Sequence, residues 1–262
     1  SGGLDNGYGL PTNLEFITFK GGPHSTSNTS ALSTLTNNPY NNKYQSANIY
    51  DETIYTTAGL PSDYDVGTRK SNLKSNFNTG VTVEFWLKHD GFGDGTKTAK
   101  QVVFDLWNSG TIGSNDYGRL TIELFGAISA GATSFHITAH SGSETLSSVA
   151  SPIGTKTTKA FVSNGWHHYA FRFYNSGTDL VTKLYVDGKI DDTNIYSGGA
   201  LGEITTTKMV GRIGALTTQV SASSPFSAAG AGKLSGSVDE FRFWKESRDG
   251  RDIGLNYFTQ VG

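Results

Sequence analysis

The sequence predicts an all-β protein made of two stacked antiparallel sheets, and three observations support this. Apolar and polar side chains alternate in many short segments, and this spacing places the two kinds on opposite faces of a β-strand. Turn-forming residues separate the segments, and glycine alone accounts for 33 of the 262 residues. Helical periodicity is almost absent. Since each sheet has one apolar face to bury, two sheets packed face to face are expected.

The expected strands follow one another along the chain with turns between them. The cleanest alternation places Val81, Val83, Phe85 and Leu87 on one face. The other strand candidates are 14–19, 47–50, 52–55, 101–107, 119–125, 134–139, 208–213 and 237–244, with 159–162 leading to a central hairpin. Residues 248–257 are expected to form a short helical turn. We expect one domain over 1–262, with 20–48 as a long loop or arm.

The segment 164–196 is the central hairpin, with two strands and a tight turn expected. The set His167, Tyr169, Phe171 and Phe173 has one parity, and the residues between them have the other. His167 and His168 therefore point to opposite faces and cannot chelate one metal ion together. Asp187-Gly188 is a common pair for a two-residue turn with positive φ angles.

Three segments carry a family resemblance. The segments 165–170 (GWHHYA) and 184–188 (LYVDG) resemble the central signature of laminin-G-like domains, and 77–88 and 236–244 are similar to the early and closing strands of that family. The family, which includes the pentraxins, belongs to the concanavalin A-like lectin/glucanase superfamily. The resemblance implies a jelly-roll sandwich. It implies a function only loosely, since the superfamily holds lectins, hydrolases, adhesion modules and virion proteins.

Composition excludes several classes of partner. The net charge is −2 without a basic block, which argues against nucleic acid and anionic membranes. The absence of cysteine excludes disulfides and thiolate metal sites and favours a bacterial or viral source. No apolar run approaches the roughly 20 residues of a membrane-spanning helix. The low charge and the Ser, Thr and Asn content suit an extracellular, cell-surface or virion setting.

Catalysis is not expected. Glucanases of the superfamily carry their carboxylates on one strand in an order close to Glu-x-Asp-x-x-Glu, and no such motif is present. Asp239 and Glu240 are adjacent and should point to opposite faces, and Glu84, Asp105 and Glu123 each stand alone on a strand. A glycoside hydrolase with a site dispersed over several strands stays open as an alternative.

Calcium is the candidate cofactor that the family resemblance suggests, since family members often bind it through oxygen ligands. Asp239 shares the parity of core-facing Phe241 and Phe243, and an inward carboxylate needs either a cation or hydrogen-bond donors. Asp90 and Asp94 lie in a glycine-rich loop that could curl around an ion or form a plain turn.

One hairpin has the chemistry that glycans require, namely an aromatic face and a few polar groups. The candidate residues are Trp107, Asn108, Asp116, Tyr117 and Arg119, with Tyr196 as a weaker candidate. Trp107 can equally be buried, and Trp86, Trp166 and Trp244 are expected to pack on the core.

The sequence thus favours a carbohydrate-binding or adhesion module of a larger extracellular or surface protein, whose partner is a glycan or surface polysaccharide. The alternative is a structural domain of a phage particle or bacterial surface assembly, whose partners are neighbouring subunits. An exposed aromatic residue beside polar groups would favour the first. A patch burying more than about 1,000 Å² against a neighbour would favour the second.

Overall fold

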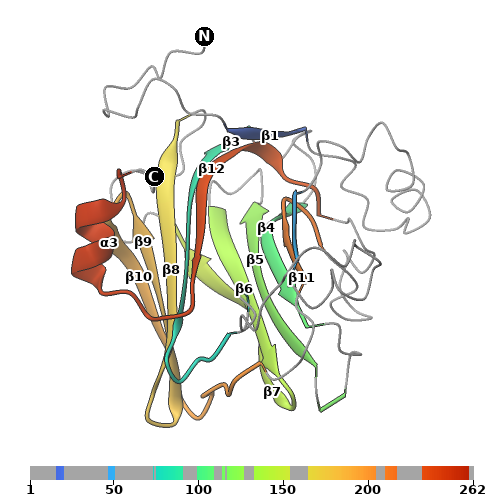
Figure 1. Cartoon of the computed structure of the whole chain (residues 1–262), viewed down its shortest axis with the longest axis vertical. Coiled ribbons are helices and arrows are strands. Elements are labelled where there is room, and N and C mark those ends of the chain that lie inside the picture. The colour runs from blue at the N-terminus through green and yellow to red at the C-terminus, as the bar shows by residue number, and fades with distance from the viewer. Residues whose placement is uncertain are drawn as a thin grey trace, which may run out of the picture.

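The computed structural model describes residues 16–20, 47–50, 73, 75–90, 99–108, 114–115, 117–126, 133–153, 165–204, 210–216 and 232–259. Over these ranges the strands form two six-stranded antiparallel sheets (Figure 1). Sheet A contains, in spatial order, β1 (Ile17–Lys20), β12 (Ser235–Trp244), β3 (Val81–His89), β8 (His167–Ser176), β9 (Asp179–Val186) and β10 (Lys189–Tyr196). Sheet B contains, in spatial order, β2 (Ala47–Tyr50), β11 (Val210–Ile213), β4 (Ala99–Trp107), β5 (Gly118–Gly126), β6 (Thr133–Ser141) and β7 (Glu144–Pro152).

The predicted all-β, two-sheet fold is confirmed, with two differences in its strands. The central segment contains three strands, because the polar break around Gly177 is itself a turn that joins β8 to β9. β7 was not predicted, because Glu144–Pro152 is rich in Ser and shows little alternation. The candidate segments 52–55 and 159–162, and residues 21–46 of the predicted arm, lie outside the described residues.

The turn between β9 and β10 has the predicted geometry. Asp187 and Gly188 have φ angles of +49° and +75°, as a two-residue hairpin turn requires. The Asp187 carboxylate also accepts a hydrogen bond from the His168 backbone N–H at 3.0 Å and contacts His167 Nδ1 at 2.9 Å. The turn therefore ties β8 to its partner strand as well as reversing the chain.

The two sheets enclose one hydrophobic core, to which both contribute aromatic rings. Phe85 of β3 lies 6.3 Å from Phe135 of β6, and Phe104 of β4 lies 5.0 Å from Phe241 of β12, measured between ring centroids. The predicted alternation of β8 is confirmed, and the structure shows which set faces inward, since Tyr169, Phe171 and Phe173 belong to this core. The larger part of the driving force for folding comes from removing such apolar surface from water.

The helix α3 (Gly250–Asn256) follows β12 and packs on the outer face of sheet A (Figure 1). It begins at Asp249, whose side chain caps the helix by accepting a hydrogen bond from the Arg251 N–H. Its buried residue, Ile253, packs against Ala170 and Tyr185 of sheet A. Within the described ranges, no helix is long and apolar enough to cross a membrane.

Candidate functional site

The outer face of sheet B carries polar and aromatic side chains in register across its strands. In β5 the residues between the core side chains are Arg119, Thr121, Glu123 and Phe125, and their cross-strand partners in β6 are His140, Thr138, His136 and Ser134. In β4, Trp107 lies opposite Arg119 and Asp105 lies opposite Thr121. Strand alternation places these residues on one surface, which we call the sheet B face.

An ion pair between Asp105 and Arg119 lies at the centre of the sheet B face. Both side chains are fully buried, and Arg119 donates from Nε and Nη2 to the two carboxylate oxygens at 2.8 and 2.5 Å. Thr121 donates to Asp105, and Arg119 Nη1 donates to the Tyr117 hydroxyl at 3.2 Å. Burial would lower the pKa of Arg119, but the charge of Asp105 outweighs it and raises that pKa. The pair is therefore a fixed, charged element of the sheet.

Half-buried aromatic side chains lie on the same face as this ion pair. Trp107 and His140 flank Arg119 in one cross-strand row, and the His140 ring lies edge-on to Tyr117 at 5.2 Å. Six residues beyond Arg119 in β5, the Phe125 ring lies 4.7 Å from that of His136. Burial, together with the Arg119 charge, lowers the pKa of His140 and favours a neutral imidazole. The sheet B face thus presents rings around a buried charged centre.

Four of the five predicted glycan contacts can be placed on or beside this face. Trp107 is half-buried, whereas Asn108, Tyr117 and Arg119 are buried, with 2%, 3% and 0% of their surface exposed. The role predicted for Arg119 is therefore corrected, because its guanidinium is engaged inside the structure and holds Asp105. Asp116 lies outside the described residues. Tyr196, the weaker candidate, packs against the core.

The predicted inward orientation of Asp239 is wrong, and a β-bulge is the reason. The register of β12 against β3 shifts between Asp239 and Arg242, and Glu240 has a φ of +45°. Val238 and Phe241 both pack in the core, so Asp239 lies opposite Trp86 on the outer side. Burial raises the pKa of Asp239.

The predicted calcium ligands do not converge where they are described. Asp90 is exposed and lies four residues beyond Trp86, the cross-strand partner of Asp239, which is about 13 Å along an extended strand. Within the described ranges, no group of three His, Cys, Asp or Glu side chains could hold a metal ion. Asp94 lies outside these ranges, so calcium binding stays a prediction.

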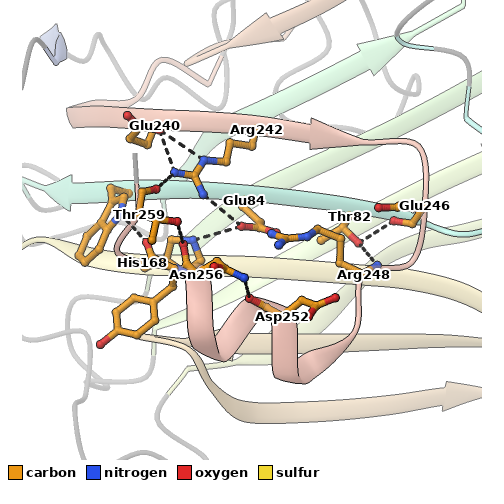
Figure 2. Close-up of polar contacts among 12 residues, drawn as sticks. Thr82, Glu84, His168, Glu240, Arg242, Glu246, Arg248, Asp252, Asn256 and Thr259 are labelled. Atoms are coloured by element: carbon orange, nitrogen blue, oxygen red, sulfur yellow. Dashed lines mark hydrogen bonds and ion pairs between the residues drawn. The ribbon is translucent and has the colours of Figure 1, made fainter. Parts of the chain in front are cut away.

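The outer face of sheet A carries a second buried polar cluster, which Figure 2 shows next to α3. Its centre is Glu84 of β3, which is fully buried and accepts a hydrogen bond from Arg248 Nη1 at 2.5 Å. The other Glu84 oxygen lies 3.6 Å from His168 Nε2 and 4.0 Å from Arg242 Nη1. Arg242 also pairs with Glu240 at 2.9 Å and donates to the Thr259 carbonyl. We call these five charged and imidazole side chains the Glu84 cluster.

The Glu84 cluster joins sheet A to the C-terminal segment. Burial raises the pKa of Glu84, but His168 and Arg248 more than compensate and hold it below its ordinary value. Burial lowers the pKa of His168, although Glu84 opposes this. The Trp86 indole adds a hydrogen bond to the Tyr257 carbonyl at 3.1 Å. A charged Glu84 beside a neutral His168 is thus the state that this environment favours.

Sequence reasoning missed most of the half-buried rings of the sheet B face and all of the Glu84 cluster. The rings could have been found, because His136 and His140 alternate with core residues in β6 and Phe125 does so in β5. The cluster could not, because it joins β3, β8 and β12 to residues beyond 247, and no local pattern encodes such contacts.

These features define a concanavalin A-like jelly-roll sandwich. The chain belongs to the concanavalin A-like lectin/glucanases superfamily, since the laminin G family model of that description matches residues 62–254. A search among curated proteins finds no match.

Solved structures are similar to this chain at low sequence identity. A heptameric SAP-like pentraxin from Limulus polyphemus is 15% identical, with a TM-score of 0.45 over 69% of this chain and 70% of that chain. The CBM40 of the Ruminococcus gnavus IT-sialidase, solved with α2,3 sialyllactose, is 14% identical, with a TM-score of 0.44 over 92% of this chain and 95% of that chain. The NanB sialidase from Streptococcus pneumoniae is 14% identical, with a TM-score of 0.44 over 80% of this chain and 26% of that chain.

Proposed function

We propose that this chain is a non-catalytic glycan-binding module that acts through the sheet B face. The observation that carries the proposal is the half-buried set of rings, Trp107, Phe125, His136 and His140, around the buried Asp105–Arg119 pair. Sugar rings present C–H faces that pack on aromatic side chains and hydroxyl groups that need polar partners. A rigid sheet with both kinds of group suits such a ligand.

The state of Asp105 supports a binding role over hydrolysis. Glycoside hydrolysis requires one carboxyl group that can give a proton to the leaving group and a second that attacks or activates water. Both Asp105 oxygens accept hydrogen bonds from Arg119, so this carboxylate is committed to the fold. Glu123 is then the other carboxylate of the described sheet B face, and one carboxyl group does not supply both roles. We therefore infer that binding is the activity.

We also infer that the setting is extracellular, on a cell surface or on a virion, as the low charge and the Ser, Thr and Asn content suggest.

A glycan array, run with the wild-type chain with and without EDTA, tests the proposal and the calcium prediction together. We expect binding to at least one glycan, and weakening by EDTA if calcium contributes. For a glycan identified in this way, Trp107→Ala should weaken binding at least about fivefold, since a stacked ring contributes roughly 1–3 kcal/mol.

The matched control is Trp166→Ala, which removes a half-buried tryptophan whose ring packs on Phe16 at 5.4 Å, near sheet A. This variant should bind as the wild type does, and thermal unfolding checks that both variants are folded. The absence of binding to any glycan, or equal weakening by both substitutions, would rule out the proposed face.

A structural role in an assembly is the second candidate, and the edge of sheet A favours it. In the described part of the chain, β10 is an edge strand and carries Ile190 and Ile195, which are 38% and 63% exposed. Edge strands with apolar side chains can pair with a neighbouring chain. Light scattering at the highest soluble concentration tests this, and a strictly monomeric chain would count against self-assembly through β10.

A further inference from the structure

The outer face of sheet A continues beyond α3 and there carries two cations side by side. Ile253 of α3 covers the cross-strand pair of Ala170 and Tyr185. The next pair that faces outward along β8 and β9 is Arg172 and Lys183, which lie directly opposite each other. Both side chains are half-buried, so their charged ends can reach a molecule in solution.

Like charges opposite each other destabilise a sheet, and nearby carboxylates do not offset this pair. The cross-strand neighbour of Arg172 in β3 is Thr82, and that of Lys183 in β10 is Thr193. Among the described residues, the ion pairs of sheet A lie around Glu84, Glu240 and Asp187 and include neither cation. The fold therefore keeps two positive charges together without a carboxylate between them.

Tyr174 holds both cations in place. Its ring centroid lies 4.7 Å from Arg172 Cζ and 5.8 Å from Lys183 Nζ. Arg172 Nε donates to Ser247 Oγ at 2.5 Å, which fixes the plane of the guanidinium and leaves its Nη groups as donors. Beside this group, exposed Ile195 lies opposite Val181, the next outward-facing residue of β9. An ordered pair of cations thus adjoins a small apolar surface.

We propose that Arg172 and Lys183, seated on Tyr174, bind the carboxylate of an acidic saccharide. A guanidinium presents parallel N–H donors that match the two oxygens of a carboxylate, and the ammonium group adds a donor from the side. The apolar surface of Ile195 suits the C–H face of the attached sugar ring. The site lies on the opposite sheet from the sheet B face, so it extends the proposed glycan binding to a second, charge-selective surface.

Calorimetric titration of the full chain with oligogalacturonate tests the site, because this probe carries carboxylates and no sulfate. Dextran is the neutral probe and dextran sulfate the sulfated one. We expect oligogalacturonate to bind at low salt and to bind more weakly at 0.15 M salt or above, where the Debye length is about 8 Å. Dextran should not bind at this site.

Arg172→Gln and Lys183→Gln should each weaken oligogalacturonate binding roughly tenfold, as expected for the loss of one charge-assisted contact. The matched control is Lys88→Gln with Lys189→Gln, which removes two charges at the other end of sheet A and should change the affinity less than about twofold. Lys183→Glu should abolish binding and raise Tm, because opposite charges would then face each other.

The outcomes separate this site from the sheet B face. Trp107→Ala should leave oligogalacturonate binding unchanged even if it abolishes the binding of an array glycan, so either proposal can fail alone. A wild-type chain that does not bind oligogalacturonate, or one that binds dextran sulfate only, overturns the carboxylate site. Equal weakening by the control variant also overturns it, because binding would then depend on net charge alone.

Discussion

The two outer faces of the sandwich use the same chemistry for different purposes. Each has a fully buried carboxylate held by arginine, namely Glu84 on sheet A and Asp105 on sheet B. The Glu84 cluster draws on residues far apart in sequence and fastens the C-terminal segment to the sheet (Figure 2). The Asp105–Arg119 pair joins neighbouring strands and shares its face with half-buried aromatic side chains. A buried ion pair therefore fastens a distant segment to the sheet in one place and connects adjacent strands in the other.

The largest expected effect on stability comes from removing the arginine that holds a buried carboxylate. Arg119→Met should lower the free energy of unfolding by about 3–5 kcal/mol, because Asp105 would stay buried without its guanidinium. On sheet A, Arg248→Met should cost less, about 1.5–3 kcal/mol, since Glu84 keeps His168 and Arg242 nearby. Denaturant titration measures both losses.

The control for this comparison removes both charges of the sheet B pair. Asp105→Leu combined with Arg119→Met should recover most of the lost stability, because no uncompensated charge remains. Equal losses for the two single variants would contradict the expected difference between the two carboxylates.

A smaller effect is expected from loosening the C-terminal segment. Ile253→Ala should lower the free energy of unfolding by about 2 kcal/mol, since the side chain is fully buried but its cluster is small. Hydrogen exchange should become faster in α3 and in the parts of β8 and β9 that it covers, while β5 and β6 stay protected. The matched change Leu255→Ala, at a position 56% exposed in the same helix, should alter stability by less than about 0.5 kcal/mol. Faster exchange in β5 would show that the two faces are not independent.

The smallest expected effect is the response to acid. The pKa of His168 is lowered from 6.5, so the unfolded chain binds a proton more readily, and stability falls as the pH drops below 6.5 until the folded pKa is reached. The pKa of Glu84 is lowered from 4.5, so its contribution is present above pH 4.5 and is lost as the pH falls through the folded pKa. Stability should therefore decline in two stages.

Thermal unfolding against pH measures this decline. His168→Gln should reduce the loss of Tm that begins below pH 6.5. His140→Gln should also reduce it, because the pKa of this sheet B imidazole is likewise lowered from 6.5. An unchanged profile in both variants would contradict the assignment of the upper stage to these imidazoles.

Local pattern predicted the sheets well and the chemistry of their faces poorly. Alternation found which residues share a face in β3 and in β8, because strand parity depends only on neighbours along the chain. The same reasoning placed Asp239 on the wrong face, since a bulge resets parity and depends on pairing with β3. It also gave Arg119 a ligand contact, because a cation next to a loop looks available until the packing around it is known.

Sequence alone determined the spacing of apolar side chains and the Asp187-Gly188 turn, because both follow from the covalent chain and its local conformational preferences. Only the tertiary structure decided which charged groups meet, such as Glu84 with Arg248 across 164 positions. Burial makes those contacts necessary, since removing water from a carboxylate is unfavourable unless a distant strand or helix supplies its partner.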